Sequence, residues 1–284
     1  MWLPFAILAA IISGSRRVYD KHLTKSFGNF SVGFIVQAFS LLPTLILFLF
    51  FPIPKDILHL PWQFWWPLLI IWLILYPVQT YFMYRSMREG ELSSVTPILA
   101  LIPAFNIISS FFLIHEIPSI LGILGIILII AGVYLLLKKR GEHMKSKPEL
   151  WMIITTIGIA IGSTLDKISV SASTPVFYSF MNTLGASIVF IILMRIYKQH
   201  GELKKMKGNL FWQFMLVGIF QAISYTASMF AFAKGPTSYV LAIRGGGYII
   251  AALWGLIVLR ENFSNRKRFA FLFFLLGVIL LAFS

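Results

Sequence analysis

The chain has 284 residues, of which 58% are apolar and 12% are charged. Soluble domains are usually about half apolar and about a quarter charged, so this composition excludes a soluble protein and indicates one embedded in a membrane. There are no cysteines, which excludes disulfide frameworks, thiolate metal sites, iron–sulfur clusters and cysteine nucleophiles.

Ten apolar segments of helical length follow one another along the chain. They run over 2–20, 30–51, 64–86, 93–114, 119–137, 150–170, 174–196, 210–233, 237–259 and 267–283. Each is close to the roughly 20 residues that cross a bilayer as a helix, and none alternates in the manner of a barrel strand. The sequence therefore predicts an all-α integral membrane protein with ten transmembrane helices, surrounded by the lipid bilayer.

The net charge of +14 is distributed unevenly between the two sides of these segments. Of the 24 Lys and Arg residues, 20 lie in or beside the loops after segments one, three, five, seven and nine. The positive-inside rule then places these five loops in the cytoplasm and both termini outside. The charge thus reflects topology in a membrane, expected to be a prokaryotic plasma membrane, rather than binding to nucleic acid.

The two halves of the chain resemble each other at an offset of 145 residues. The matches are Gly90 with Gly235, Ser93 with Ser238, Val95 with Val240, Glu116 with Glu261, and Gly132-Val133 with Gly277-Val278. At an offset of 146, Asp20-Lys21 matches Asp166-Lys167. Because five helices is an odd number, the second copy must enter the membrane from the opposite side. We expect two inverted five-helix repeats, 1–137 and 150–284, joined by a basic cytoplasmic linker at 138–149, which is a common plan of secondary transporters.

Two motifs recur at equivalent places in the halves. The fourth helix of each begins with a Gly…Ser-x-Val pattern and ends with a glutamate three residues before a serine, in 116-EIPS-119 and 261-ENFS-264. With the inverted repeat, these motifs resemble the EamA-type transporter family of the drug/metabolite transporter superfamily. The resemblance covers nearly the whole chain and implies export or import of amino-acid-like or other small metabolites. Members are often drawn with cytoplasmic termini, whereas the charges here place both termini outside.

The two motif glutamates have a structural interpretation and a functional one. Each serine can cap the helix that follows, and each carboxylate suits the positive end of a helix dipole. A structural role for Glu116 and Glu261 is therefore the first expectation, and contact with a solute is the alternative.

Arg244 is the sharpest candidate for function, because it lies about eight residues, or roughly 12 Å, inside the ninth segment. A charge at such depth usually faces a protein interior or a watery cavity. Guanidinium binds carboxylate and phosphate with two parallel hydrogen bonds, so Arg244 is predicted to anchor a solute; an ion pair with Asp166 is the alternative. The glycines at 245–247 are either a packing face or an unwound stretch, and Tyr248 and Trp254 continue toward the expected cavity.

Several matched polar residues are expected to line this cavity. They are Tyr76, Gln79 and Thr80 in the third segment, Gln221, Ser224 and Tyr225 in the eighth, Gln37 and Asn182 in the second and seventh, and Asn106 in the fourth. Spacings of three and four put each set on one helix face, and polar groups within a membrane need partners. Hydrogen bonds between helices without a solute role are the alternative.

Asp20 and Asp166 lie toward opposite sides of the membrane. One interpretation is an interfacial salt bridge with the adjacent lysine, whose side chain reaches outward. The other is a gate charge or, for Asp166, a proton-coupling carboxylate.

These features together predict a secondary transporter that moves a small polar or anionic metabolite, amino-acid-like or similar, by alternating access through a cavity between the repeats. One alternative is an exporter of hydrophobic or cationic compounds, bound by the aromatic residues that form 16% of the chain. Another is a membrane scaffold or accessory subunit that transports nothing. The expected partners are a small-molecule solute and a coupling proton or ion; the sequence specifies no oligomeric state.

An enzyme is not expected. The five histidines lack HExxH spacing, and no phosphate-binding GxxxxGK[ST] motif occurs. We therefore predict no catalytic residue, metal or cofactor.

Overall fold

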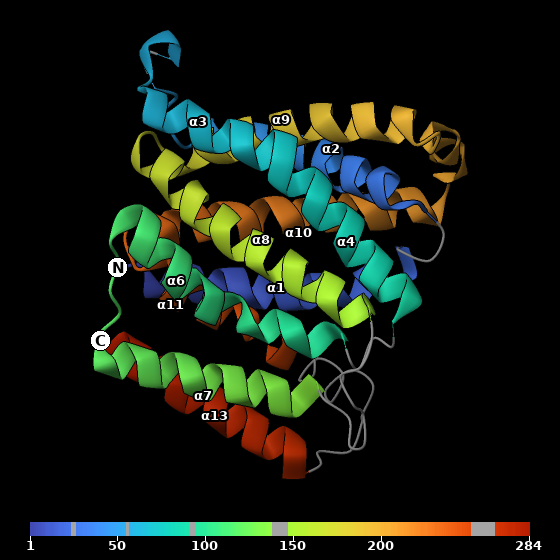
Figure 1. Ribbon diagram of the computed structural model, residues 1–284. Coiled ribbons are helices and arrows are strands. Elements are labelled where there is room, and N and C mark those ends of the chain that lie inside the picture. The colour runs from blue at the N-terminus through green and yellow to red at the C-terminus, as the bar shows by residue number, and fades with distance from the viewer. Residues whose placement is uncertain (24–26, 55–56, 91–94, 138–146, 251–264) are drawn as a thin grey trace.

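The computed structural model is a bundle of helices with both termini at one end (Figure 1). The structure describes residues 1–23, 27–54, 57–90, 95–137, 147–250 and 265–284, without the side chains of 17–23, 58, 136–137 and 266–267. Every regular element within these ranges is helical, which confirms the predicted all-α class.

The helices follow the predicted segments closely. The first half contains α1 (Leu3–Leu23), α2 (Asn29–Leu47), η1 (Ile57–His59), α3 (Trp62–Ile70), η2 (Ile71–Leu75), α4 (Tyr76–Glu89), η3 (Thr96–Leu101), α6 (Ile102–Ile114) and α7 (Ile120–Leu137). The second half contains α8 (Lys147–Ser171), α9 (Pro175–Ile196), η4 (His200–Lys205), α10 (Asn209–Phe232), α11 (Thr237–Gly245) and α13 (Asn265–Ala282).

Six helical stretches within the described residues are long and apolar enough to cross a membrane. They are Asn29–Leu47, Trp62–Glu89, Thr96–Ile114, Lys147–Ser171, Pro175–Ile196 and Asn209–Phe232. Three shorter apolar helices cover Leu3–Arg16, Ile120–Leu135 and Arg268–Ala282. The ninth predicted segment begins with α11 and continues beyond the described residues. The membrane-type architecture is therefore confirmed, while the full number of ten spans stays a prediction.

The packing of the helices follows the two repeats. Helix α1 packs on α10, and its counterpart α8 packs on α4, the counterpart of α10. In the same way, α6 packs on α8 and α11 packs on α1. Helices α1 and α8 run in opposite directions along the bundle (Figure 1), as an inverted repeat requires.

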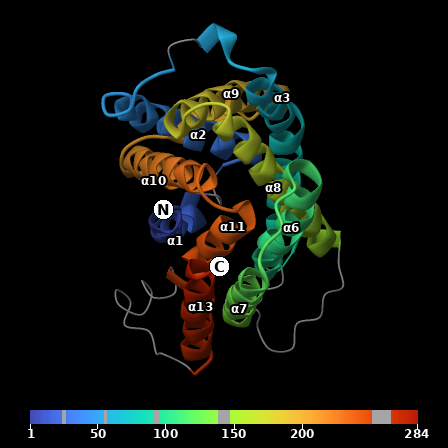
Figure 2. The same ribbon diagram turned by 90° about the vertical axis from the view of Figure 1, so that its left-hand side faces the viewer.

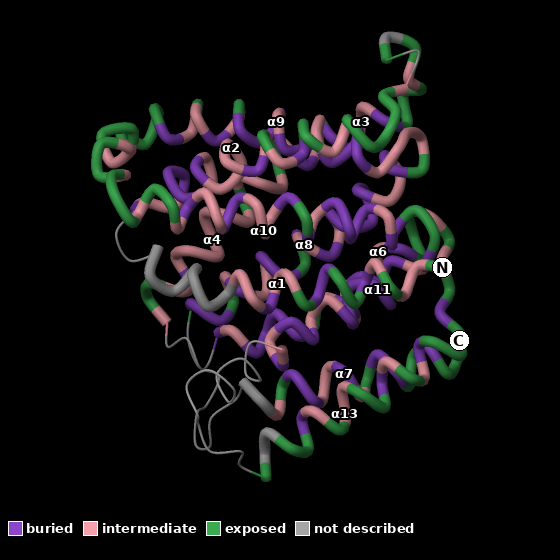
Figure 3. Tube along the Cα trace, turned by 180° about the vertical axis from the view of Figure 1, so that it is seen from behind, coloured by how far each residue is buried: buried purple, intermediate pink, exposed green. Residues whose placement is uncertain are grey.

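The last helices of the two repeats, α7 and α13, form a layer of their own (Figure 2). Glycines let their backbones approach closely, because a Cβ atom on Gly125 would lie 3.0 Å from the carbonyl oxygen of Gly277. Both helices carry exposed residues along their length (Figure 3). Large apolar side chains are among them, including Ile127 and Phe269. An apolar exterior of this kind suits contact with lipid rather than water.

The fourth helix of each repeat is interrupted at equivalent positions. In the first repeat, the 3₁₀ turns of η3 give way to α6 after Leu101. In the second repeat, α11 ends at Gly245, and Gly246 forms a turn before helical residues resume. Leu101 and Gly246 are 145 residues apart, which is the offset of the repeat. The turn at Gly246 fits the unwound stretch that was one of the two interpretations of the glycines at 245–247. The change from 3₁₀ to α geometry after Leu101 was not predicted.

Candidate functional site

A cluster of hydrogen-bonded side chains lies between the helices and joins both repeats. Its members are Trp72 from η2, Tyr76 from α4, Asp166 from α8, Tyr178 and Asn182 from α9, and Tyr225 from α10. We refer to these six residues as the central cluster. Paired polar groups at this depth are expected only where they hold one another or a ligand.

Asp166 is the acidic residue of the cluster and is only 9% exposed. Its Oδ1 atom accepts hydrogen bonds from the hydroxyls of Tyr178, at 2.5 Å, and Tyr225, at 3.0 Å. A carboxylate in an apolar interior requires such donors, because an unpaired buried charge is costly. The two tyrosines therefore hold the carboxylate in place without neutralising it.

Asn182 connects the other side of the cluster. Its Nδ2 atom donates to the hydroxyl of Tyr76, at 2.8 Å, and to the hydroxyl of Tyr225. Its Oδ1 atom accepts from the indole Nε1 of Trp72, at 2.8 Å. Because an indole only donates, Trp72 fixes which way the amide of Asn182 points.

The local backbone explains how Trp72 and Tyr76 reach the cluster. Trp72 lies in η2, a π-helical turn, and Tyr76 follows directly at the start of α4. A π-helical turn inserts extra backbone and redirects the side chains around it. Gly185 of α9 provides the space, because a Cβ atom there would overlap the indole of Trp72.

Arg244 lies in the last turn of α11, one residue before Gly245 ends the helix, and it is half-buried. The negative end of the helix dipole favours a cation at this place. The guanidinium interacts electrostatically with Asp166 and with Tyr76. The structure thus brings Arg244 toward the central cluster, next to the interruption of its own helix.

Four other predicted residues face neighbouring helices instead of the central cluster. The side chain of Gln221 accepts a hydrogen bond from Arg16 of α1, and the hydroxyl of Ser224 donates to the carbonyl oxygen of Ala9, at 3.0 Å. The amide of Asn106 donates to Ala160 and Thr164 of α8, and Gln79 lies against Gly158 and Gly162 of that helix. The polar face predicted on α10 therefore divides, because Tyr225 turns toward α9 and the other two residues turn toward α1.

The remaining predicted residues are less informative. Gln37 and Thr80 are half-buried on α2 and α4, and Tyr248 packs against two apolar clusters. Trp254, Glu261 and the side chain of Asp20 lie outside the described residues.

Sequence reasoning missed two members of the central cluster, Trp72 and Tyr178. Each lies four residues before a residue that was predicted, since Trp72 precedes Tyr76 and Tyr178 precedes Asn182. Residues four apart are neighbours on a helix surface. Their spacing from the predicted residues was therefore the available signal. Including one more helical turn before Tyr76 and before Asn182 would have identified Trp72 and Tyr178.

Lys167 follows Asp166 in the chain but makes contacts at the end of the bundle. Its Nζ atom donates to Oε1 of Glu116 and, at 2.8 Å, to the carbonyl oxygen of Gly235. Both charged side chains are about one-fifth exposed, at 20% and 21%. The interpretation of Asp166 and Lys167 as an interfacial salt bridge is therefore wrong, because Lys167 pairs with Glu116 and Asp166 turns inward.

Glu116 has the structural role expected of it, but toward a different helix. Its Oε2 atom accepts from the backbone nitrogen and the hydroxyl of Thr237, each at 3.0 Å, so it caps α11 rather than the helix that follows it. Ser119 caps that helix, α7, by accepting from the backbone nitrogen of Gly122 at 3.0 Å, which confirms the predicted serine cap. Glu116 belongs to the first repeat and its partners to the second.

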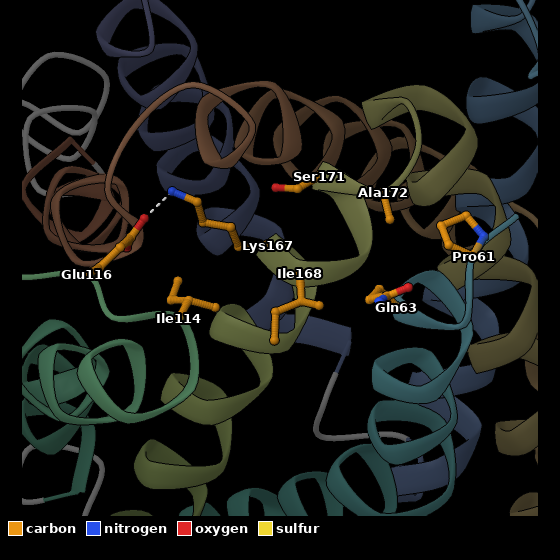
Figure 4. Close-up of a pocket in the computed structure, with 8 residues that line it drawn as sticks. All are labelled: Pro61, Gln63, Ile114, Glu116, Lys167, Ile168, Ser171 and Ala172. Atoms are coloured by element: carbon orange, nitrogen blue, oxygen red, sulfur yellow. Dashed lines mark hydrogen bonds and ion pairs between the residues drawn. The ribbon is translucent and has the colours of Figure 1, made fainter.

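A pocket of about 460 Å³ adjoins this contact (Figure 4). It is lined by Pro61, Gln63, Ile114, Glu116, Lys167, Ile168, Ser171 and Ala172. These residues come from the beginning of α3 and the ends of α6 and α8. The pocket is therefore at the edge of the bundle, whereas the central cluster lies between the helices.

Within the ranges that the structure describes, no group of three His, Asp or Glu side chains could hold a metal ion. The chemistry that the central cluster offers is reversible binding: one carboxylate, one nearby guanidinium, three phenolic hydroxyls, an amide and an indole.

Comparison with known proteins shows a similar solved structure and a matching family. A solved structure described only as a crystal structure of a protein is similar, with a TM-score of 0.80 and 12% identity over 98% of this chain and 95% of that chain. This likeness concerns the fold alone. No curated protein matches the sequence. The model of the EamA-like transporter family matches residues 1–138 and again residues 146–283. The chain therefore belongs to the EamA-like transporter family, within the drug/metabolite transporter superfamily.

Proposed function

We propose that the protein is a secondary transporter of a small polar or anionic metabolite, and that an amino-acid-like zwitterion is the solute that best suits its charges. The observation that carries this proposal is the central cluster, in which hydrogen bonds through Asn182 and Tyr225 connect Tyr76 of the first repeat to Asp166 of the second. Arg244 of α11 acts electrostatically on the same carboxylate. Arg244 would hold the carboxylate of the solute. Asp166 and its tyrosines would receive the ammonium group.

The interrupted helices support the same location. Broken helices at corresponding positions of two inverted repeats typically border the solute site of a transporter. Here the interruption at Gly246 follows Arg244 by two residues. The backbone of Gly246 keeps its hydrogen bonds, since its nitrogen donates to Ile243 and its carbonyl oxygen accepts from Ile249. The guanidinium of Arg244 would therefore be the group that binds the solute beside this turn.

Alternating access requires contacts between the repeats that open in turn at the two ends. At one end, Glu116 binds Lys167 and Thr237. At the other end, Oε2 of Glu202 accepts from the backbone nitrogen of Gly28, at 2.7 Å. Each carboxylate thus binds a backbone nitrogen at the start of a helix in the opposite repeat. In our proposal one contact opens while the other stays closed, and the solute site is exposed to one side at a time.

The sidedness in this proposal comes from the charge distribution. The end that carries Glu202 adjoins the basic loops and would face the cytoplasm, whereas the end that carries Glu116 and both termini would face outward. Asp166 is the proposed coupling residue, because a buried carboxylate between neutral hydroxyls can take up a proton when the solute leaves. The protein would act in a prokaryotic plasma membrane without a cofactor.

A second candidate function is export of hydrophobic or cationic compounds. The specific observation in its favour is that two tyrosines, Tyr178 and Tyr225, hold the Asp166 carboxylate. Two more aromatic side chains, Tyr76 and Trp72, join the same group through Asn182. Aromatic faces and a carboxylate together attract organic cations. In this alternative Arg244 would serve only as a structural partner of Asp166.

Counterflow in proteoliposomes separates the two functions. One set of vesicles would be loaded with a mixture of unlabelled amino acids, and entry of trace radiolabelled amino acids would be measured. A parallel set would be loaded with unlabelled tetraphenylphosphonium, the cationic probe, and entry of the labelled cation would be measured. We expect wild type and Arg195→Gln, an exposed control on α9, to exchange amino acids, and Arg244→Gln to lose about tenfold or more, as expected for one charge-assisted contact. Exchange of tetraphenylphosphonium alone, retained in Arg244→Gln, would establish the cation exporter. No exchange of any probe would favour the scaffold interpretation.

A further inference from the structure

We infer that the pocket beside Glu116 and Lys167 is a second binding site, for a small zwitterionic amphiphile. It lies on the opposite face of α8 from the central cluster. Each residue of a helix is turned by about 100° from the one before it, so Lys167, Ile168 and Ser171 are centred on the face away from Asp166. A ligand in the pocket therefore does not contact the central cluster.

The charged wall of the pocket has hydrogen-bonding capacity left. An ammonium group has three donors, and within the described residues Lys167 uses two, toward Glu116 and the carbonyl oxygen of Gly235. A carboxylate has about four acceptor positions, and Glu116 uses three, toward Lys167 and twice toward Thr237. One donor and one acceptor thus remain at a site where both side chains line the cavity.

The other walls of the pocket suit an apolar portion. Ile114 and Ile168 lie beside the charged pair, and Pro61 and Ala172 lie farther along (Figure 4). The volume of about 460 Å³ is within the range of small-molecule sites. A ligand that presents an ammonium group to Glu116, an anionic group to Lys167 and a short apolar part to the isoleucines matches all of these walls.

The location of the pocket allows a zwitterionic ligand to come from either of two sources. The pocket lies where α3 begins and where α6 and α8 end, next to Trp62, which is 65% exposed. Exposed tryptophans at helix ends are typical of the membrane interface. A zwitterion can therefore arrive from the aqueous phase as a free amino acid, or from the bilayer as a phosphoethanolamine headgroup. The inference rests on the proposed function only in that the free amino acid would be the transported class.

The test measures the melting temperature of the full chain in detergent with four probes. These are leucine, leucinamide (cation only), 4-methylpentanoate (anion only) and dihexanoylphosphatidylethanolamine. A ligand that binds the folded state raises the melting temperature in a concentration-dependent way. We expect leucine or the short-chain lipid to raise it, and each single-charge analogue to bind about tenfold or more weakly, since it lacks one charge-assisted hydrogen bond.

Matched variants separate this site from the central one. Ser171→Trp fills the pocket, Ser171→Ala is its control, and Lys167→Gln removes the cation without adding bulk. The rise in melting temperature caused by leucine or the short-chain lipid should persist in Ser171→Ala and in Arg244→Gln. It should disappear in Ser171→Trp and in Lys167→Gln. Loss of the shift in Arg244→Gln alone would support the proposed function and overturn this inference. An unchanged shift in Ser171→Trp, equal shifts with the single-charge analogues, or no shift with millimolar leucine or lipid would also overturn it.

Discussion

Asp166 and Lys167 are consecutive residues of one helix, but they lie in very different surroundings. Asp166 points into the bundle, where neutral tyrosine hydroxyls hold it and Arg244 acts on it electrostatically. Lys167 lies at the end of the bundle, where it forms an ion pair with Glu116. A turn of about 100° between neighbours is enough to separate an interior carboxylate from a charge at the membrane edge.

The two places differ in what their charges contact within the protein. The edge pair ties the two repeats together, because Lys167 and Glu116 bind each other across them. The interior carboxylate is held by groups that leave its charge in place, and a charge retained at such depth is expected to have a function. Variants at these two places should therefore differ in whether transport or folding fails first.

The largest expected effect is at Asp166. Asp166→Leu leaves the hydroxyls of Tyr178 and Tyr225 without their acceptor, so we expect stability to fall by about 2 kcal/mol or more and transport to be lost. Asp166→Asn keeps an acceptor oxygen, and it should fold normally but still fail to transport. Thermal unfolding in detergent and counterflow measure the two effects. Wild-type counterflow by Asp166→Asn would show that the charge has no role.

The next largest effect is expected at Gly185, which provides the space for the indole of Trp72. Gly185→Ala should lower stability by about 1–3 kcal/mol, because the new Cβ atom overlaps the indole and the tightly packed interior must shift. The matched control is Gly201→Ala, since a Cβ atom there has nothing within 4 Å. Both are measured by thermal unfolding. If the two variants unfold alike, the close contact between α9 and η2 does not hold the cluster.

A smaller effect is expected for the edge pair. Glu116→Gln and Lys167→Gln should each lower stability by about 1 kcal/mol or less, because both side chains are partly exposed. In a double-mutant cycle the two changes should combine less than additively, since each removes the same interaction. Additive losses in thermal unfolding would mean that the pair contributes no mutual energy.

The smallest effect is expected at the start of α7. Ser119→Ala removes the acceptor for the backbone nitrogen of Gly122 and should cost about 0.5–1 kcal/mol. Ser171→Ala is a control at the exposed end of another helix. Equal melting temperatures for the two variants would rule out a capping contribution from Ser119.

The sequence predicted the fold better than the site. Apolar length, alternating loop charge and the offset of 145 residues indicated the helices and the repeat, because lipid imposes these patterns along the whole chain. The glycines at 245–247 left packing and unwinding open, since glycine in a membrane helix serves both. The change of helix geometry after Leu101 had no comparable signal in the sequence.

Within the site, Tyr76, Asn182, Tyr225 and Asp166 were predicted, and the structure brings them together. Gln221 and Ser224 were predicted with them but face α1, because residues three or four apart share a face that is wide enough to contact two neighbouring helices. Which neighbour each side chain meets depends on the rotation of the helix in the bundle, and a single sequence does not encode that rotation locally.

The most direct test of the account compares counterflow by Arg244→Gln, Asp166→Asn and the double variant. If both side chains hold the solute, each single variant loses amino-acid exchange and the double variant remains inactive. If they only neutralise each other, the double variant removes both charges at once and regains exchange. Recovery of exchange in the double variant would contradict the central claim that Arg244 and Asp166 form the solute site.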